Sequence, residues 1–451
     1  MISEIKAYHI RICLSLLVVA HFATAPVQAQ YAQQGEKLAG ALETGPAQRG
    51  YSVALSADGN SALIGAPGDP AVGAASVYKR NVARSRTAFR VAPWPSLPPP
   101  PIWTEVAKLD CPPGNPCNGS PMGGQGFSVA LSADGHIALI GGPNDNFGVG
   151  AAWMFGLHGW QSHSKLVGTQ SSGPANQGTS VALSATGATA LVGGPSDSGG
   201  RGAAWVFAFN GGQWVGQGKL VGSNSSPLAF QGWSVALSAD GTTALLGAPN
   251  DNGTGAVWVF NRGGSENSCR PSQAAMAVLC GVGAGNPSDA WTEQAKLAVP
   301  PGPVSFGYSV ALSKDGNTAL IGSNGPAFAA WVYVRDAAGW TRQGTLAVST
   351  GDRLSVALSG DGNTALVGAP GTAATGAAWV FMRDQGVWSQ QRNALIGAGA
   401  SGNAQQGWSV AISADASTAL LGGPIDSFGA GAAWPFIRAA VSSGAGAGGL
   451  R

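Results

Sequence analysis

The amino-acid sequence predicts an all-β fold, a seven-bladed β-propeller of four-stranded blades whose ring is closed by an N-terminal strand. The main observation is a refrain, Ser-Val-Ala-Leu-Ser, which occurs seven times with Ile412 replacing Leu in the last copy. The copies begin at Ser52, Ser128, Ser180, Ser234, Ser309, Ser355 and Ser409. A recurring β-unit of roughly 50 residues is typical of a propeller. No stretch after residue 29 has an apolar period of 3.6 residues, so we expect almost no helix.

Each copy contains the same four segments, and the third copy shows them without an insertion. After the refrain come an apolar run from Ala190 to Pro195, the segment Ala203 to Phe207, and the segment Trp214 to Leu220. The segments are short, rich in Val, Leu, Trp and Phe, and separated by Gly, Asn, Asp and Pro. This pattern predicts strands joined by turns.

The lengths of the links between segments predict the order of the strands within a blade. Residues 156–159 suit a hairpin, whereas the long link from Leu166 to Ser180 suits a crossing from rim to hub. We therefore expect the refrain to be the innermost strand and the Trp-x4-Lys-Leu segment to be the outermost. The last copy lacks an outermost segment, and Tyr31 to Leu38 resembles one. We expect it to complete the seventh blade and to leave no open edge.

Residues 1–29 have the features of an export signal. Lys6 and Arg11 precede an apolar run from Ile12 to Ala20, and Val27 to Ala29 supplies the small residues of a cleavage site. The alternative is a retained membrane anchor, which we disfavour because a span requires about 20 apolar residues. We expect a secreted or cell-envelope protein in the periplasm, at the cell surface or outside the cell, with no stable membrane insertion after cleavage.

The predicted propeller covers residues 30–441, and a flexible tail rich in Gly and Ala follows at 442–451. Insertions at 79–102 and 261–290 interrupt the regular pattern between third and fourth strands. The first combines a basic arm with a stiff proline tract, and irregular loops are better functional candidates than repeated positions. The alternative is that both are tolerated surface loops. The candidate ligand-binding residues of the first insertion are Arg84, Arg86, Arg90 and Trp94.

Cysteine usage agrees with export. Apart from Cys13 in the predicted signal, the cysteines form two close pairs, Cys111 with Cys117 and Cys269 with Cys280, which we expect to be local disulfides. A zinc site needs four ligands brought together, and these pairs belong to different copies, so we predict no metal there.

The net charge and the few histidines argue against nucleic-acid binding and against catalysis. The chain has 24 basic and 22 acidic residues and a formal net charge of +2, whereas nucleic-acid binding would require a basic face. The histidines after residue 29 are His136, His158 and His163, and no Ser-His-Asp relay is visible. We therefore predict no catalytic residues, no nucleic-acid partner, and a protein or carbohydrate ligand.

Two short motifs recur in the copies. Phe306-Gly307 supplies a Phe-Gly pair, and Gly65-Ala66-Pro67, Gly247-Ala248-Pro249 and Gly368-Ala369-Pro370 supply Gly-Ala-Pro. In these motifs, over nearly all of the predicted mature chain, the sequence resembles the FG-GAP family of integrin α-chain heads and many bacterial exported proteins. The resemblance implies an extracellular binding and adhesion propeller, often with calcium in the hairpin before Gly-Ala-Pro.

The hairpin loops depart from the family's calcium pattern. Calcium takes six to eight oxygen ligands, but each loop here is reduced to Ser-x-Asp-Gly or a variant of it, with at most one carboxylate. We expect simple turns and no bound cofactor, and calcium remains the alternative that the family resemblance implies. The loop carboxylates are Asp58, Asp134, Asp240, Asp315, Asp361 and Asp415.

A second set of carboxylates follows the motif's proline by two residues. We expect these residues on the face that carries the rim-to-hub links, opposite the insertions, where they would bind cations or a basic or hydroxylated ligand. The alternative is that they only form turns. The set consists of Asp69, Asp145, Asp197, Asp251 and Asp426.

Tryptophans are numerous, but all of the 15 except Trp94 occupy repeat positions, including Trp233 and Trp408 just before the refrain. We expect them to pack between blades rather than to bind sugars. The sequence thus predicts a non-enzymatic binding and adhesion propeller. The alternative is a propeller lyase or glycosidase that uses the Asp residues on the loop face, because a fold does not dictate a function.

Overall fold

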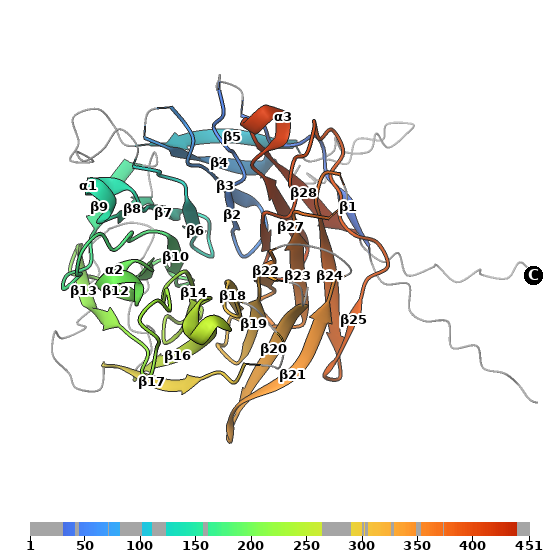
Figure 1. Cartoon of the computed structure of the whole chain (residues 1–451). Coiled ribbons are helices and arrows are strands. Elements are labelled where there is room, and N and C mark those ends of the chain that lie inside the picture. Colours follow the sequence, from blue (N-terminus) through green and yellow to red (C-terminus); the bar gives the residue numbers. More distant parts are fainter. Residues whose placement is uncertain are drawn as a thin grey trace, which may run out of the picture. The chain divides into compact units, whose positions relative to one another are not determined.

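The computed structural model describes most of the chain between residues 30 and 439. The described residues are 30–40, 45–70, 72–81, 102–110, 123–156, 161–263, 290–299, 302, 305–325, 329–348, 353–372 and 374–439. They form seven four-stranded antiparallel sheets arranged as blades around an axis, which confirms the predicted seven-bladed propeller (Figure 1). Within these ranges, no helix is both long enough and apolar enough to cross a membrane.

The two inner strands of each blade come from the refrain and from the apolar run after it. The innermost strands are β2 (Ser52–Leu55), β6 (Ser128–Leu131), β10 (Ser180–Leu183), β14 (Ser234–Leu237), β18 (Ser309–Leu312), β22 (Ser355–Leu358) and β26 (Ser409–Ile412). The second strands are β3 (Ser61–Ala66), β7 (Ile137–Gly142), β11 (Thr189–Gly194), β15 (Thr243–Ala248), β19 (Thr318–Gly322), β23 (Thr364–Ala369) and β27 (Thr418–Gly423). Innermost strands of neighbouring blades contact one another all round the hub, as the link lengths predict.

The two outer strands carry most of the tryptophans. The third strands are β4 (Ala74–Asn81), β8 (Ala151–Gly156), β12 (Ala203–Asn210), β16 (Ala256–Arg262), β20 (Ala329–Asp336), β24 (Ala377–Asp384) and β28 (Ala432–Arg438). The outermost strands are β5 (Ile102–Leu109), β9 (Gln161–Leu166), β13 (Gln213–Leu220), β17 (Trp291–Lys296), β21 (Gly339–Ala347), β25 (Val387–Gln390) and β1 (Tyr31–Gln33). Blades are numbered 1 to 7 by their innermost strands, from β2 to β26. Third-strand tryptophans such as Trp153 and Trp434 are buried in clusters that span two blades, as expected.

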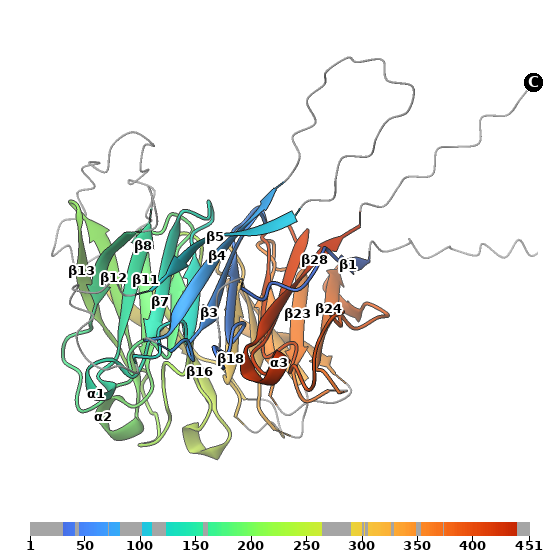
Figure 2. The same cartoon turned by 90° about the horizontal axis from the view of Figure 1, so that it is seen from above.

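Among the described residues, helix is confined to short turns in the loop between second and third strands. These turns are α1 (Asp145–Gly148), α2 (Asp197–Gly200), α3 (Asp426–Gly429) and the 3-10 turn η1 (Asp251–Gly253). Figure 2 shows α1, α2 and α3 on one face of the ring. The rim-to-hub links lie on the same face, because the backbone N–H of Gln48 donates to Gly429 at 2.8 Å and that of Gln177 donates to Val149 at 3.0 Å.

The N-terminal strand closes the ring at the rim. Strand β1 pairs with β28 in antiparallel register, with Tyr31 opposite Arg438, and Leu38 exchanges two backbone hydrogen bonds with Ala433 at 2.7 and 3.1 Å. The Tyr31 hydroxyl also donates to the Ala416 carbonyl. The prediction that Tyr31 to Leu38 completes blade 7 is confirmed.

The refrain serines join each blade to the next. In six blades the first serine donates its hydroxyl to a glycine carbonyl of the following blade, as Ser52 does to Gly126 and Ser409 does to Gly50, both at 2.8 Å. In blade 5, Ser309 instead accepts the backbone N–H of Val356 at 3.0 Å. Close approach at this contact also explains the glycine of the Gly-Ala-Pro motif. A Cβ at Gly65 would lie only 2.1 Å from the Gly126 carbonyl oxygen.

Candidate functional site

A pocket of about 420 Å³ lies on the propeller axis, lined by the first residues of all seven innermost strands and by the residues just before them. Those preceding residues belong to the rim-to-hub links, so the pocket opens on the face that carries α1, α2 and α3. Its volume is within the range of small-molecule sites. In blade order, the large or polar side chains around it are Tyr51, Phe127, Thr179, Trp233, Tyr308, Arg353 and Trp408.

The aromatic side chains of the pocket contact one another around the axis. The ring centroids of Tyr51 lie 4.8 Å from Phe127 and 5.4 Å from Trp408, and those of Trp233 and Tyr308 are 5.8 Å apart. All five rings are half-buried. Trp233 and Trp408 each contact an aromatic ring of a neighbouring blade, as expected, but the link also places both at the mouth of the hub, where they line the pocket.

Arg353 brings a positive charge into this aromatic ring. Its guanidinium carbon lies 3.4 Å from the Trp408 ring centroid and 5.2 Å from that of Tyr308, within the range of cation–π attraction. No described residue forms an ion pair with Arg353 or accepts a hydrogen bond from its guanidinium. Burial lowers the pKa of Arg353, while Tyr308 and Tyr51 oppose that shift. An arginine nevertheless stays charged in proteins, so the pocket holds a cation that has no counter-ion among the described residues.

The local sequence of blade 6 explains why an arginine occupies this place. In the other blades a glycine precedes the refrain by two residues, with φ between +79° and +87°, and a Cβ at Gly50 would lie 2.2 Å from the Ala432 carbonyl oxygen. Residues 348–354 form the shortest of the seven links, and the backbone of Arg353 pairs with Asn324. Leu354 is buried, and Arg353 stands where the glycine would be. This one exception to the repeat is the signal by which sequence reasoning could have found the residue.

The predicted second set of carboxylates lies on the expected face but is engaged within the protein. Each of these Asp side chains is buried and pairs with a lysine of the outermost strand or, in blade 7, of the segment just after it. We call this arrangement the Asp–Lys clasp. The pairs are Asp69–Lys108 at 2.8 Å, Asp145–Lys165 at 2.6 Å, Asp197–Lys219 at 2.6 Å, Asp251–Lys296 at 2.7 Å and Asp426–Lys37 at 2.5 Å.

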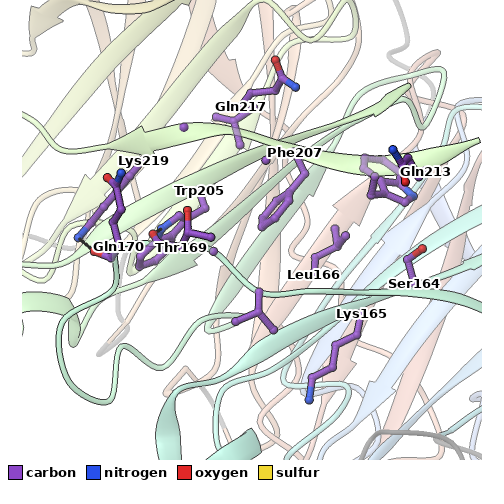
Figure 3. A pocket seen from close by; sticks show the side chains of 16 residues that line it. Ser164, Lys165, Leu166, Thr169, Gln170, Trp205, Phe207, Gln213, Gln217 and Lys219 are labelled. Carbon is purple, nitrogen blue, oxygen red and sulfur yellow. Dashed lines mark hydrogen bonds between the residues drawn. The ribbon is translucent and has the colours of Figure 1, made fainter. Parts of the chain in front are cut away.

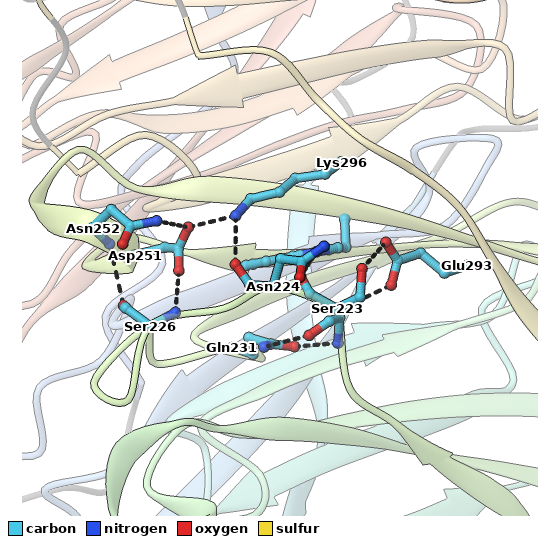
Figure 4. A network of polar contacts seen from close by, with 10 residues as sticks. Ser223, Asn224, Ser226, Gln231, Asp251, Asn252, Glu293 and Lys296 are labelled. Atoms are coloured by element: carbon cyan, nitrogen blue, oxygen red, sulfur yellow. Dashed lines mark hydrogen bonds and ion pairs between the residues drawn. The ribbon is translucent and has the colours of Figure 1, made fainter.

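In the clasp of blade 4, both carboxylate oxygens have hydrogen-bond or ion-pair partners within the protein (Figure 4). One oxygen of Asp251 pairs with Lys296 and accepts from Asn252 at 3.2 Å, and the other accepts the backbone N–H of Ser226 at 2.7 Å. Lys296 also lies 4.5 Å from the Trp258 ring centroid. A ligand would have to displace this lysine in order to reach the carboxylate.

The pattern of clasps along the chain supports a structural role. Blades 5 and 6 have Thr345 and Asn393 where the other blades have the lysine, and blade 6 has Thr372 where they have the aspartate. Asp and Lys are thus absent together in blade 6, as expected for two halves of one contact. Lys37 supplies the lysine of blade 7 from the closing segment.

The hairpin carboxylates also bond within their own loops. Asp58 accepts from the Ser56 hydroxyl at 2.6 Å and from the Asn60 backbone at 3.0 Å. Burial raises the pKa of Asp58, but these hydrogen bonds outweigh it and hold the pKa below its usual value. In the part of the chain that the structure describes, no group of three or more His, Cys, Asp and Glu could hold a metal ion.

The remaining predicted site residues lie outside the described residues. These are Arg84, Arg86, Arg90 and Trp94 of the first insertion, and the cysteines Cys111, Cys117, Cys269 and Cys280. The flanking strands β4 and β5 place the first insertion between the third and fourth strands of blade 1, as its position in the repeat indicates.

A second hollow of about 530 Å³ lies toward the rim between blades 2 and 3 (Figure 3). Trp205 and Phe207 form its apolar wall, and its charged groups already have partners. Lys219 pairs with Asp197 and also donates to the Gln170 carbonyl at 2.9 Å, and Lys165 pairs with Asp145. The axial pocket differs because its cation has no such partner among the described residues.

No protein-family model and no curated protein matches this chain.

Proposed function

We propose that this chain is an exported, non-enzymatic binding and adhesion propeller of the FG-GAP type, which recognises a glycan or protein partner through its axial pocket. The proposal rests on one observation, the convergence at the mouth of the hub of five half-buried aromatic rings and of Arg353, which has no ion-pair partner among the described residues. Concave sites that combine aromatic walls with a few polar groups are typical of ligand binding. The export features of residues 1–29 support action at the cell envelope or outside the cell.

The chemistry of the pocket favours binding over catalysis. Its described lining residues include no carboxylate, imidazole or thiol, which are the groups that most often transfer protons near neutral pH. Six of the serines that line it donate their hydroxyls to backbone carbonyls, as Ser128 and Ser234 do at 2.8 Å. The carboxylates on the same face are held in Asp–Lys clasps.

A binding screen with paired tryptophan variants tests the proposal. The mature protein would be presented to arrays of glycans and of envelope-derived peptides, and ligands would be titrated by calorimetry. Trp408→Ala and Trp233→Ala should weaken binding at least tenfold, because each removes a face on which a ligand ring stacks. Trp388→Ala is the matched control, since Trp388 is also half-buried but lies on the outermost strand β25. Ligands that bind all four proteins equally would contradict the proposal.

A further inference from the structure

We infer that the axial pocket selects an acidic sugar, whose carboxylate binds Arg353 while its ring lies against the aromatic side chains. This inference rests on the proposed binding function and adds the class of ligand. It follows from the state of the guanidinium, the order of side chains around the axis, and the backbone at the pocket mouth.

The guanidinium of Arg353 makes cation–π contacts but no hydrogen bond to a described residue. Trp408 and Tyr308 lie within cation–π range of it, while its N–H groups donate to no described residue. An arginine edge presents a planar fork of donors that matches the two oxygens of a carboxylate. Arg353 is partly buried, so its charge is less well solvated by water than that of an exposed arginine. A bound carboxylate would supply the hydrogen bonds that water no longer provides.

The charges around the pocket also favour an anion. Among the described residues that line it, Arg353 is the only charged group, and Asp145, Asp251 and Asp426 of the loop face are paired with lysines. A cationic ligand would meet Arg353 without any opposing carboxylate in the lining. A neutral ligand would leave the guanidinium unpaired.

The order of side chains leaves room for a ring next to the cation. Going round the axis, Arg353 and Thr179 are three blades apart, which is as far as two positions in a ring of seven can be. Thr179 is the smallest of the side chains before the refrain, and its hydroxyl is already bonded to the Asn176 carbonyl at 2.8 Å. A sugar with its carboxylate at Arg353 would therefore extend toward Thr179 between the aromatic walls.

The backbone at the pocket mouth argues for a sugar rather than a peptide terminus. Proteins often capture a peptide carboxylate with free backbone N–H groups. Here those groups are used, since Gly50 donates to Gly65 at 2.9 Å, and Trp233 and Tyr308 donate to Phe230 and Ser305 at 3.1 Å. Recognition must come from side chains, and an aromatic wall beside a guanidinium suits a ring that carries a carboxylate.

Titration of matched acidic and neutral sugars tests this inference. The probes are hexuronate oligosaccharides, sialyl oligosaccharides, and the same hexuronates after reduction of their carboxyl groups to alcohols. We expect one of the acidic series to bind and carboxyl reduction to weaken it by about 10- to 100-fold, the usual loss for a hydrogen bond to a charged group. Whichever acidic series binds identifies the source of the carboxylate.

Variants of Arg353 complete the test. Arg353→Gln should bind the acidic probe as weakly as the reduced probe, while its affinity for the reduced probe stays unchanged. Arg353→Lys should keep part of the preference, because it retains the charge without the planar fork. Arg383→Gln, which removes an arginine stacked on Trp388 at 5.4 Å, is the matched control and should change neither affinity.

The outcomes separate this inference from the function on which it rests. Equal binding of acidic and reduced probes, lost in Trp408→Ala, would overturn the acidic-sugar inference and leave the binding function standing. Binding of a peptide through its free carboxylate, lost in Arg353→Gln, would also overturn the inference. Absence of any ligand that depends on Trp408 would contradict the proposed function itself.

Discussion

The backbone N–H of Ala414 in blade 7 donates a hydrogen bond of 3.0 Å to the carbonyl of Ala57 in blade 1. This contact closes a continuous ring, because the corresponding residue of every blade donates to that of the next at 2.9 to 3.0 Å. The other members of this ring are Ala133, Ala185, Ala239, Lys314 and Gly360. The propeller is thus closed twice, by backbone contacts at the hub and by strand β1 at the rim.

Removal of the closing segment should destabilise the whole ring. Deletion of residues 31–38 would expose the edge of β28 and leave Asp426 buried without Lys37. We expect a lower melting temperature and aggregation, because unpaired strand edges recruit other chains. Thermal unfolding with light scattering measures both. A truncated protein that melts like the mature one would show that the hub ring alone is sufficient.

Each Asp–Lys clasp should contribute to stability as a coupled pair. Lys296→Met leaves the Asp251 carboxylate, 2% exposed, without its counter-charge. We expect a loss of about 2 kcal/mol in the free energy of unfolding, because an unpaired buried charge is costly. The double variant Lys296→Met with Asp251→Asn should recover much of that loss in a double-mutant cycle measured by urea unfolding. Additive effects of the two substitutions would contradict the pairing.

The hairpin carboxylates predict an acid limit to stability. Hydrogen bonds outweigh burial and hold the pKa of Asp58, Asp315 and Asp361 below the usual value. A group whose folded pKa is lowered stabilises the protein fully above its unfolded pKa, near 4, and the stability is lost as the pH falls through the folded pKa.

Melting temperatures should therefore stay level, as far as these groups contribute, between about pH 7 and 5 and fall below about pH 4. Asp361→Asn should make the acid fall shallower. Thr186→Ser, in the one hairpin that has Thr in place of the aspartate, should leave the slope unchanged. An unchanged slope in Asp361→Asn would contradict the assignment of these hydrogen bonds.

Calcium should have no effect on the folded protein. Each hairpin loop has at most one carboxylate, and in the described loops its hydrogen bonds come from its own turn, as those of Asp361 come from Ser359 and Asn363. A ligand that binds only the native state raises the melting temperature, so chelation with EGTA should leave it unchanged. A clear fall on chelation would restore the calcium sites that the family resemblance implies.

Local sequence signals were sufficient to predict the propeller but not its pocket. The refrain, the Gly-Ala-Pro motif and the Trp-x4-Lys segment are short and repeated, so strand order and the closing role of residues 31–38 could be inferred from spacing. The Asp residues after the motif's proline and the Lys residues of the Trp-x4-Lys segment both recur in the sequence. Their pairing could not be predicted, because it depends on how the loop between second and third strands lies against the outermost strand.

The pocket depends on side chains that lie far apart in the sequence. Trp233, Arg353 and Trp408 meet only because seven links converge on one axis, and the direction of each side chain depends on backbone conformation just before the refrain. The contacts of Trp233 and Trp408 with neighbouring blades follow from the repeat, but their place in the pocket does not. Arg353 breaks the repeat in a single copy, so no recurring pattern predicts its position.

The structure of the protein in complex with an acidic glycan that it binds is the most direct test of the axial site. We predict the sugar ring on the propeller axis against Trp408 and Tyr308, with its carboxylate within hydrogen-bond distance of the Arg353 guanidinium. A ligand bound at the Asp–Lys clasps, at the first insertion or anywhere else outside the axial pocket would contradict the account.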